Sequence, residues 1–457
     1  METETRWTVD QVLALAPDAA SRTAGAKLAQ PAPWSGTGAA GTAVWGLCKG
    51  SGSKPYQTAV DTRGPAYRCT CPSRKFPCKH ALALLLLWAG GADGPIAAAG
   101  AAGASAEPEW VEQWTAARRK KEESGAGGAA GADAPRAAGP ADPGAARKRA
   151  DRRAVRVEGG AAELEQRLAD LLRGGLAGAD TAGHKAFDET AARMVDAQAP
   201  GLAARVRELG AIPATGGDWP SRMLEETALL HLLARGFLGR EGLPEPLVDT
   251  VRARIGFTVD SADLLAGPTV HGQWLVLAQY DTTDDLTTRR IWLHDAAAGR
   301  FALVLSFGAA GRAPQLALPV GLVVEAELAY HPSAVPLRAA LGAHRASVEA
   351  PGTIPPGTAI GPALDAYGAA LADDPWLDAW PVLLTDVVPV PGPDRWQLAD
   401  VAGPDAVPLT GPAPWRLAAL SGGHPLTLFA ELTPTGARPL TAWSPSSPAP
   451  APTPVLA

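Results

Sequence analysis

The chain has 457 residues, enough for two or three domains, and its formal net charge at pH 7 is −6. The charge is uneven, because residues 1–156 carry +7 and residues 157–457 carry −13. This distribution argues against a protein that coats nucleic acid along its whole length. No apolar run reaches the length of a membrane span, and the polar start METETRWTVD is not a signal peptide. We therefore expect a soluble cytoplasmic protein.

The first ninety residues predict a small domain of helices and strands. Residues 8–28 predict one or two short helices, broken near Pro17 and with Thr8 as a candidate N-cap. The apolar run 81–88 predicts a helix that is buried on all sides. Between these helices, alternating and apolar runs predict three short strands at 44–47, 56–61 and 67–71.

Three of the four cysteines form a C-x-C-x6-C-x-H cluster with one histidine: Cys69, Cys71, Cys78 and His80. Three thiolates and one imidazole suit tetrahedral zinc, and four protein ligands leave no open position for water or substrate. We therefore expect one structural Zn²⁺. The alternative is a disulfide plus a free thiol, which is rare in cytosolic chains. Cys48 is either a spare ligand or a buried small hydrophobic residue in a strand.

The segment VWGLCKGSGSKPYQTAVDTRGPAYRCTCPSRKFPCKHALALLLLWA, residues 44–89, resembles the SWIM zinc finger of bacterial proteins of actinobacterial type. The later stretch ARMVDAQAPGLAARVREL, residues 192–209, resembles the same family. The resemblance implies that Cys69, Cys71, Cys78 and His80 bind the zinc. It also implies binding of DNA or protein. Genes for MoxR-like AAA+ ATPases and von Willebrand factor A proteins often lie beside those of bacterial members, so these are the protein partners that it implies.

Residues 93–157 are rich in alanine and glycine and predict a flexible low-complexity linker. Within it, Pro108–Glu123 predicts a short basic helix that carries Trp110 and Trp114. This helix is either a docking segment or packed back on the finger domain. A second basic run, 147–156, is interpreted as the solvated face of a helix start or as a contact with phosphate or an acidic partner.

The remaining two thirds divide by their hydrophobic period. Residues 158–258 follow the helical period, and residues 259–445 alternate as strands do. The Pro-rich tail 446–457 is predicted to be disordered. The fold class is thus α+β multidomain: a small zinc-bound αβ finger domain (1–92), a flexible Ala/Gly-rich linker, a helical region and a β-rich C-terminal domain. Strands of that last domain are expected at 273–280, 289–294, 301–307, 322–330, 381–390, 396–402, 415–419 and 426–431.

No motif of catalysis is found. The sequence has no nucleophile elbow, Walker loop, dinucleotide fingerprint, HExxH or paired acidic motif. Asp281, Asp284 and Asp285 lack the further ligands of a calcium loop, and we expect them in a solvated hairpin. The sequence therefore predicts a non-catalytic protein without a small-molecule substrate.

Two functions remain. The first is a protein-interaction adaptor or scaffold, anchored by the finger. The second is a module that binds DNA or RNA through basic side chains of the finger, because phosphate contacts need lysine and arginine. For either function the candidate contact residues are Arg63, Arg68, Arg74, Lys75 and Lys79, with Lys49 and Lys54 nearby.

Overall fold

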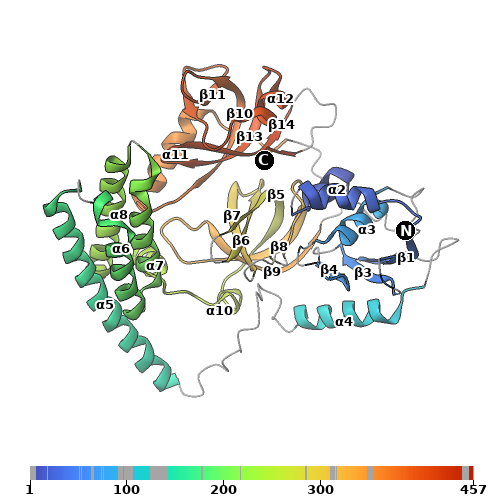
Figure 1. Cartoon of the computed structure of the whole chain (residues 1–457), viewed down its shortest axis with the longest axis horizontal. Helices are drawn as coiled ribbons and strands as arrows, with labels where there is room; N and C mark the ends of the chain where they lie inside the picture. Colours follow the sequence, from blue (N-terminus) through green and yellow to red (C-terminus); the bar gives the residue numbers. More distant parts are fainter. Residues whose placement is uncertain are drawn as a thin grey trace.

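The computed structural model has four parts: a finger unit, a helical bundle, a β-barrel and a second sheet (Figure 1). The barrel lies between the finger unit and the bundle, and the second sheet lies against the barrel. This mixed architecture confirms the predicted α+β class. The structure describes residues 7–17, 19–50, 52, 54–62, 66–73, 75, 77–90, 96, 106–123, 143–176, 179–216, 218–283, 286–308, 314, 316–346, 354–444 and 452–455.

The finger unit is built on a four-stranded antiparallel sheet in the order β1-β2-β3-β4. Neighbouring residues along a strand face opposite sides. Val44 and Val60 accordingly pack with helix α3, whereas Trp45 and Ala59 pack with helix α4. Both faces of the sheet are therefore covered. The strands are β1 (Trp34–Ala40), β2 (Ala43–Cys48), β3 (Tyr56–Asp61) and β4 (Ala66–Cys69).

Three helices close one side of this sheet: α1 (Val9–Ala14), α2 (Ala19–Leu28) and α3 (Lys79–Ala89). Thr8 caps α1 as predicted, since its hydroxyl accepts a hydrogen bond from the Gln11 backbone N–H at 3.2 Å. Helix α3 is buried almost all round, as its composition predicts. Helix α2 approaches it closely at Gly25, where an added Cβ would lie 2.9 Å from the Cβ of Leu82.

Helix α4 (Glu109–Glu123) covers the other face of the sheet. Its Val111 is fully buried. The guanidinium of Arg68 donates to the carbonyl of Trp110 at 3.0 Å and lies 5.6 Å from the centre of its ring. Of the two interpretations of this helix, packing back on the finger is therefore correct.

The helical bundle has a hydrophobic core of its own, around residues such as Met194, Leu233 and Phe237. Its first helix begins at Pro143 rather than at 158, so the second basic run lies on that helix. None of the described helices is long and apolar enough to cross a bilayer. The helices are α5 (Pro143–Gly174), α6 (Ala179–Asp196), α7 (Pro200–Ala211), α8 (Trp219–Leu238) and α9 (Glu245–Ile255), with 3-10 turns η2 (Ile212–Thr215) and η3 (Arg240–Gly242) and the short α10 (Ser261–Leu265) after them.

The barrel closes in the order β5-β6-β7-β9-β8. All neighbours are antiparallel except β7 and β9, which pair in parallel. The long first strand pairs with β8 through its first half and with β6 through its second. This is the strand order of the five-stranded Greek-key barrel called the OB-fold. The strands are β5 (Val270–Thr283), β6 (Thr287–Asp295), β7 (Arg300–Gly308), β8 (Val323–Tyr330) and β9 (Arg338–Ala346).

The second sheet has six strands in the order β12-β11-β10-β13-β14-β15. Two expectations were wrong here. Trp415–Ala419 was expected as a strand but lies in helix α12 (Trp415–Ser421). The tail was expected to be disordered, but Thr453–Pro454 pairs with β14. The other elements are α11 (Ile360–Asp373), β10 (Trp380–Pro391), β11 (Trp396–Asp400), β12 (Ala406–Pro408), β13 (Leu426–Thr433), β14 (Gly436–Trp443) and β15 (Thr453–Pro454).

The parts are joined by buried contacts. One hydrophobic cluster contains both α3 residues such as Leu84 and barrel residues such as Val276 and Leu293. The bundle is tied to the segment after α11, where the guanidinium of Arg254 pairs with the buried carboxylate of Asp374 at 2.7 Å. The finger therefore shares its core with the barrel, whereas the bundle does not.

Candidate metal centre

Four side chains of the finger meet between β4 and α3. Cys69 ends β4, Cys71 follows it, Cys78 is the N-cap of α3 and His80 lies in its first turn. Their sulfur and ring-nitrogen atoms all lie within 4.8 Å of one another. The structure thus brings together all four residues of the predicted cluster.

Local structure explains this meeting. The pairing of β3 with β4 places Cys69 opposite Thr58, whose hydroxyl oxygen lies 3.3 Å from the Cys69 sulfur. The backbone of Cys78 is extended (φ −73°, ψ 166°), and its carbonyl accepts the first helical hydrogen bond from Leu82. A helix N-terminus favours negative charge, so this position stabilises a thiolate.

Burial separates the four residues into two pairs. Cys69 and Cys71 are half-buried, whereas Cys78 and His80 are buried. The ring of Tyr56 lies 5.0 Å from that of His80, at an interplanar angle of 44°. One side of the cluster thus meets the core of the finger and the other faces its surface.

Hydrogen bonds within the cluster change the acidities of its members. Those from Cys69 and Cys78 lower the pKa of Cys71, and those with Cys69 and Cys71 raise the pKa of Cys78. Burial lowers the pKa of His80, but the Cys69 and Cys71 sulfurs outweigh it and raise this pKa to about 9. The four groups thus share protons at close range, and a bound divalent cation would replace those protons.

The donor set fits zinc. Three sulfurs and one imidazole are the ligands of structural zinc sites, and a fourth protein ligand completes the tetrahedron. All four cysteines are free of disulfides. Cys48 is fully buried in β2 and lies outside the cluster, as the small-hydrophobe interpretation predicts. Burial raises the pKa of its thiol.

The predicted contact residues do not share one environment. Lys75 and Lys79 are exposed and line a groove beside the cluster, together with Lys49. Arg68 is half-buried and is held by Trp110 of α4. Arg63 and Arg74 lie outside the described residues.

Sequence reasoning missed the groove itself. Its opposite wall comes from α2, which contributes small side chains at helical spacing, Ala20 and Ala24. That spacing of small residues was visible in the sequence. The sequence did not show which face of the sheet this helix would pack against.

The N-terminal fold and its Cys3His site define a protein with a structural zinc finger. A model of the SWIM zinc finger matches residues 59–89, and a model of the SWIM-associated four-helix bundle domain matches residues 152–255. The chain therefore carries a SWIM zinc finger with one structural zinc and the bundle associated with it. The second match contains the stretch 192–209, which confirms that part of the resemblance too. Comparisons with curated proteins and with solved structures gave no match.

Proposed function

We propose that this chain is a non-catalytic adaptor, in which zinc-bound Cys69, Cys71, Cys78 and His80 hold the finger that contacts a partner protein. The four side chains fill the tetrahedral coordination of the metal, so no position remains for a substrate. The bundle, the barrel and the second sheet would then be further surfaces of the same scaffold. We propose that the domains are a finger domain at 1–92 and a bundle from Pro143 to about 258. The α4 region with its flanking segments lies between them, and a β-rich part follows the bundle.

A groove beside the zinc cluster carries the proposal. It has a volume of about 590 Å³ and lies between α2, the ends of β2 and β3, and the loop that follows Cys71. No aspartate or glutamate occurs among the described residues that line it. The lining residues are Ala20, Ser21, Ala24, Leu28, Lys49, Gly50, Tyr56, Cys71, Pro72, Ser73, Lys75, Lys79 and His80.

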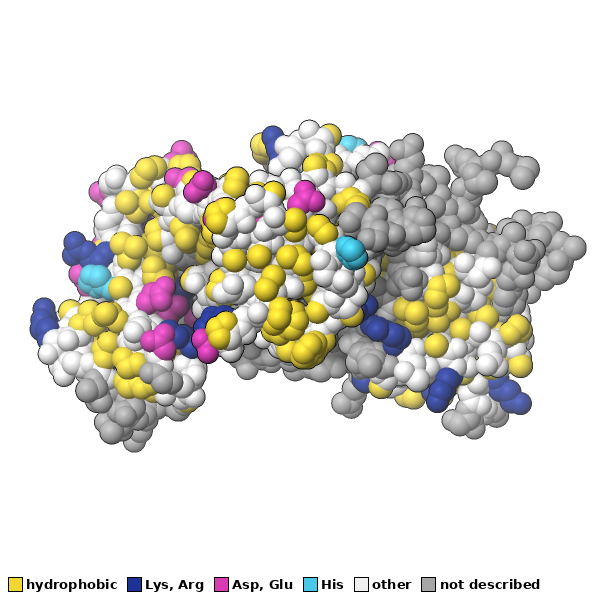
Figure 2. Space-filling model, turned by 90° about the horizontal axis from the view of Figure 1, so that it is seen from above, with side chains coloured by type: hydrophobic (Ala, Val, Ile, Leu, Met, Phe, Trp, Pro, Cys, Tyr) yellow, Lys and Arg dark blue, Asp and Glu magenta, His cyan; other side chains and the backbone are white. Residues whose placement is uncertain are grey.

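The charge of this groove indicates an acidic partner. Lys49, Lys75 and Lys79 are all exposed around it, so the groove carries positive charge at the surface. On the face shown in Figure 2, lysine and arginine side chains stand out over the finger, whereas the bundle shows acidic side chains together with basic ones. Charges of one sign at the rim steer a partner of the opposite sign and set its orientation.

The family resemblance suggests which partners to try. We propose a MoxR-like AAA+ ATPase and a von Willebrand factor A protein as candidates, through an acidic surface on one of them. The lysines of the groove support an acidic partner, and the family resemblance supports these two proteins as the candidates.

We expect the double substitution Lys75→Gln and Lys79→Gln in the full chain to weaken capture of such a partner at least about tenfold, ~1.4 kcal/mol. Zinc content should not change, because neither lysine is a ligand. Affinity is measured by biolayer interferometry with the purified partner at two salt concentrations. Lys27→Gln is the matched control, since Lys27 is exposed on α2 but does not line the groove.

The proposal fails if the full chain captures neither candidate protein and no other stable partner. It also fails if the double variant binds as well as the unchanged chain, since the groove would then take no part. Equal losses for Lys27→Gln and the double variant would indicate a general charge effect instead.

Nucleic-acid binding by the same groove is the second candidate. The three lysines favour it, because a phosphate backbone is held by such side chains and binding then falls steeply with salt. Arg68 weakens it, because its guanidinium is engaged with Trp110. Fluorescence anisotropy of the full chain with labelled duplex DNA distinguishes the two functions. Binding at low salt that the double variant abolishes would support nucleic-acid binding over the adaptor function.

A further inference from the structure

The strand pairing that closes the barrel is incomplete between β7 and β9. These strands pair in parallel at only two positions, Leu303 with Arg338 and Val304 with Ala339. A cavity of about 80 Å³ lies along this seam, lined by Val304, Arg338 and Ala339 of these pairs and by residues that follow them on both strands. The seam is thus a gap in the wall of an otherwise closed barrel.

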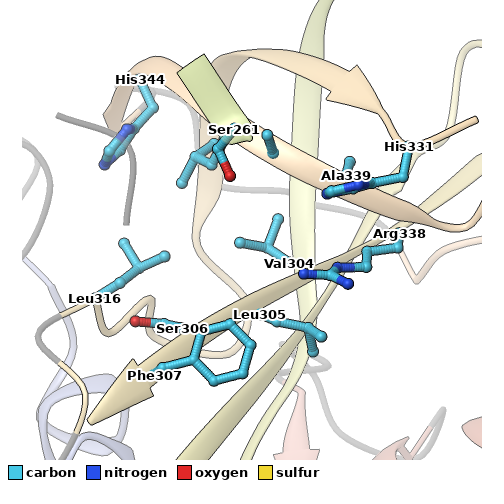
Figure 3. A pocket seen from close by; sticks show the side chains of 12 residues that line it. Ser261, Val304, Leu305, Ser306, Phe307, Leu316, His331, Arg338, Ala339 and His344 are labelled. Carbon is cyan, nitrogen blue, oxygen red and sulfur yellow. The ribbon is translucent and has the colours of Figure 1, made fainter. Parts of the chain in front are cut away.

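Polar side chains surround this cavity at two ends (Figure 3). Arg338 and His331 lie at one end, and Ser261, Ser306 and His344 lie toward the other. The rest of the described lining is apolar or aromatic, and it includes no aspartate or glutamate. A lining that can donate hydrogen bonds and carries positive charge, but no negative charge, selects for an anion.

Arg338 is the main feature of the cavity. Within the described part of the chain, no carboxylate lies at ion-pair distance from its guanidinium. Burial together with the charge of Arg338 lowers the pKa of the adjacent His331 to about 4. The side chain of Arg338 is exposed at its end of the cavity, so an anion that enters there can pair with the guanidinium.

We propose that this cavity is an anion site that holds one phosphate group, with Arg338 as its principal ligand. The planar guanidinium matches two phosphate oxygens at once, and the serine hydroxyls can donate to the others. Sites for whole small molecules measure roughly 300–1,000 Å³, so this cavity takes a single group rather than a nucleoside. The phosphate is either a free ion or one phosphate of a nucleic-acid strand.

Phe307 supports a nucleic-acid strand as the source of the phosphate. It lies on β7 at the cavity and is 39% exposed, although it is a large aromatic residue. Proteins that bind single strands pair phosphate contacts with aromatic side chains on which bases stack. A strand with one phosphate at Arg338 could place its neighbouring base on this ring.

The fold alone does not carry this inference. OB-fold barrels bind oligonucleotides on the face of their second and third strands. Here the outer face of β6 and β7 carries Trp292 and Leu303, which pack against Phe429 of the second sheet. That face is covered within the chain at Trp292 and Leu303, and the proposal therefore depends on the lining of the seam itself.

The test uses the full chain with Lys75→Gln and Lys79→Gln, so that phosphate at the finger groove does not contribute. Inorganic phosphate is titrated calorimetrically at constant ionic strength against chloride. Arg338→Gln should weaken binding at least about tenfold. Arg338→Lys should weaken it by less, because a lysine keeps the positive charge but cannot bind two phosphate oxygens with a planar guanidinium. Arg300→Gln is the control, since Arg300 is an exposed arginine of β7 that does not line the cavity.

A second arm replaces phosphate with a short oligothymidylate. If it binds through Arg338 and is weakened by Phe307→Ala, the site takes a phosphate of a single strand. If only inorganic phosphate binds through Arg338, the site takes the free ion, and the proposal holds in that form. Absence of binding by both probes, or equal binding by the Arg338→Gln and unchanged proteins, would overturn it. The finger groove has lost two of its three lysines in every protein of this test, so differences between the variants report on the barrel seam.

Discussion

Replacing Cys71 with serine is expected to reduce bound zinc from one ion per chain to near none. The substitution removes one of four ligands that lie within 4.8 Å of one another, and a serine hydroxyl is a poor replacement for a thiolate. His80→Ala should have the same effect, since it removes the imidazole. Structural zinc contributes about 10–16 kcal/mol of apparent binding free energy in finger peptides. Metal content is measured by mass spectrometry on purified, folded protein.

The loss of zinc should spread beyond the finger. Helix α3 and the barrel share one hydrophobic cluster, so loosening of α3 exposes part of the barrel core. The bundle α5–α9 has a separate core and should keep its structure. Hydrogen exchange of the two variants should therefore show faster exchange in β1–β4, α3 and the barrel, with α7 and α8 unchanged.

Cys48→Ala is the matched control for these variants. Cys48 is the one cysteine outside the cluster, and its removal should leave zinc content at one ion per chain. Full zinc content in both Cys71→Ser and His80→Ala would contradict the ligand assignment. Loss of zinc in Cys48→Ala with retention in His80→Ala would show that Cys48 is the fourth ligand.

Replacing Glu431 with leucine is expected to destabilise the chain by about 3–5 kcal/mol. The carboxylate is only 2% exposed and lies between the barrel and the second sheet. It accepts hydrogen bonds from the hydroxyl of Tyr280 at 2.6 Å and from the ring N–H of Trp292 at 2.7 Å. Arg438 lies 3.5 Å from its second oxygen. A leucine would leave these donors and the charge of Arg438 without their acceptor.

The change in stability is measured by urea denaturation, with intrinsic tryptophan fluorescence as the signal. Tyr280→Phe removes one of the hydrogen bonds and keeps the carboxylate, so it should cost less, about 1–3 kcal/mol. Glu325→Leu is the control, because Glu325 pairs with the exposed Arg345 at the barrel surface and such pairs contribute about 0–1 kcal/mol. A loss for Glu431→Leu no larger than that for Glu325→Leu would show that Glu431 does not hold the two sheets together.

The zinc cluster was predictable because it is local. Its four residues span twelve positions, and the cysteine spacing alone indicates a metal. The helix behind it was equally plain, since a run of leucines with no polar face can only be buried. Both features could be predicted because each depends on residues that are close together in the sequence.

Strands without a strong pattern were missed. β1 has the sequence WSGTGAA, with Thr37 as its one β-branched residue, and β9 has the sequence RAALGAHRA, with none. Neither shows the run of β-branched or alternating residues that indicates a strand. They form because neighbouring strands supply the hydrogen bonds. Trp415–Ala419 shows the opposite error: Leu417 and Ser421 are buried four residues apart on one face of a helix.

The groove and the barrel seam could not be predicted from the sequence. The groove joins α2 to a loop fifty residues later, and the seam depends on where a parallel strand pair ends. Such sites are set by the packing of distant segments. Helix α11 was within reach, because Ile360, Ala363, Tyr367 and Ala370 follow the helical period.

X-ray absorption at the zinc edge tests the central claim most directly. The account predicts three sulfur neighbours at about 2.3 Å and one light neighbour, the imidazole nitrogen, at about 2.0–2.1 Å. The nitrogen contribution should disappear in His80→Cys, which converts the site to four sulfurs. A second light neighbour, whether oxygen or nitrogen, would contradict a closed Cys3His site. It would also contradict a structural rather than catalytic role for the zinc.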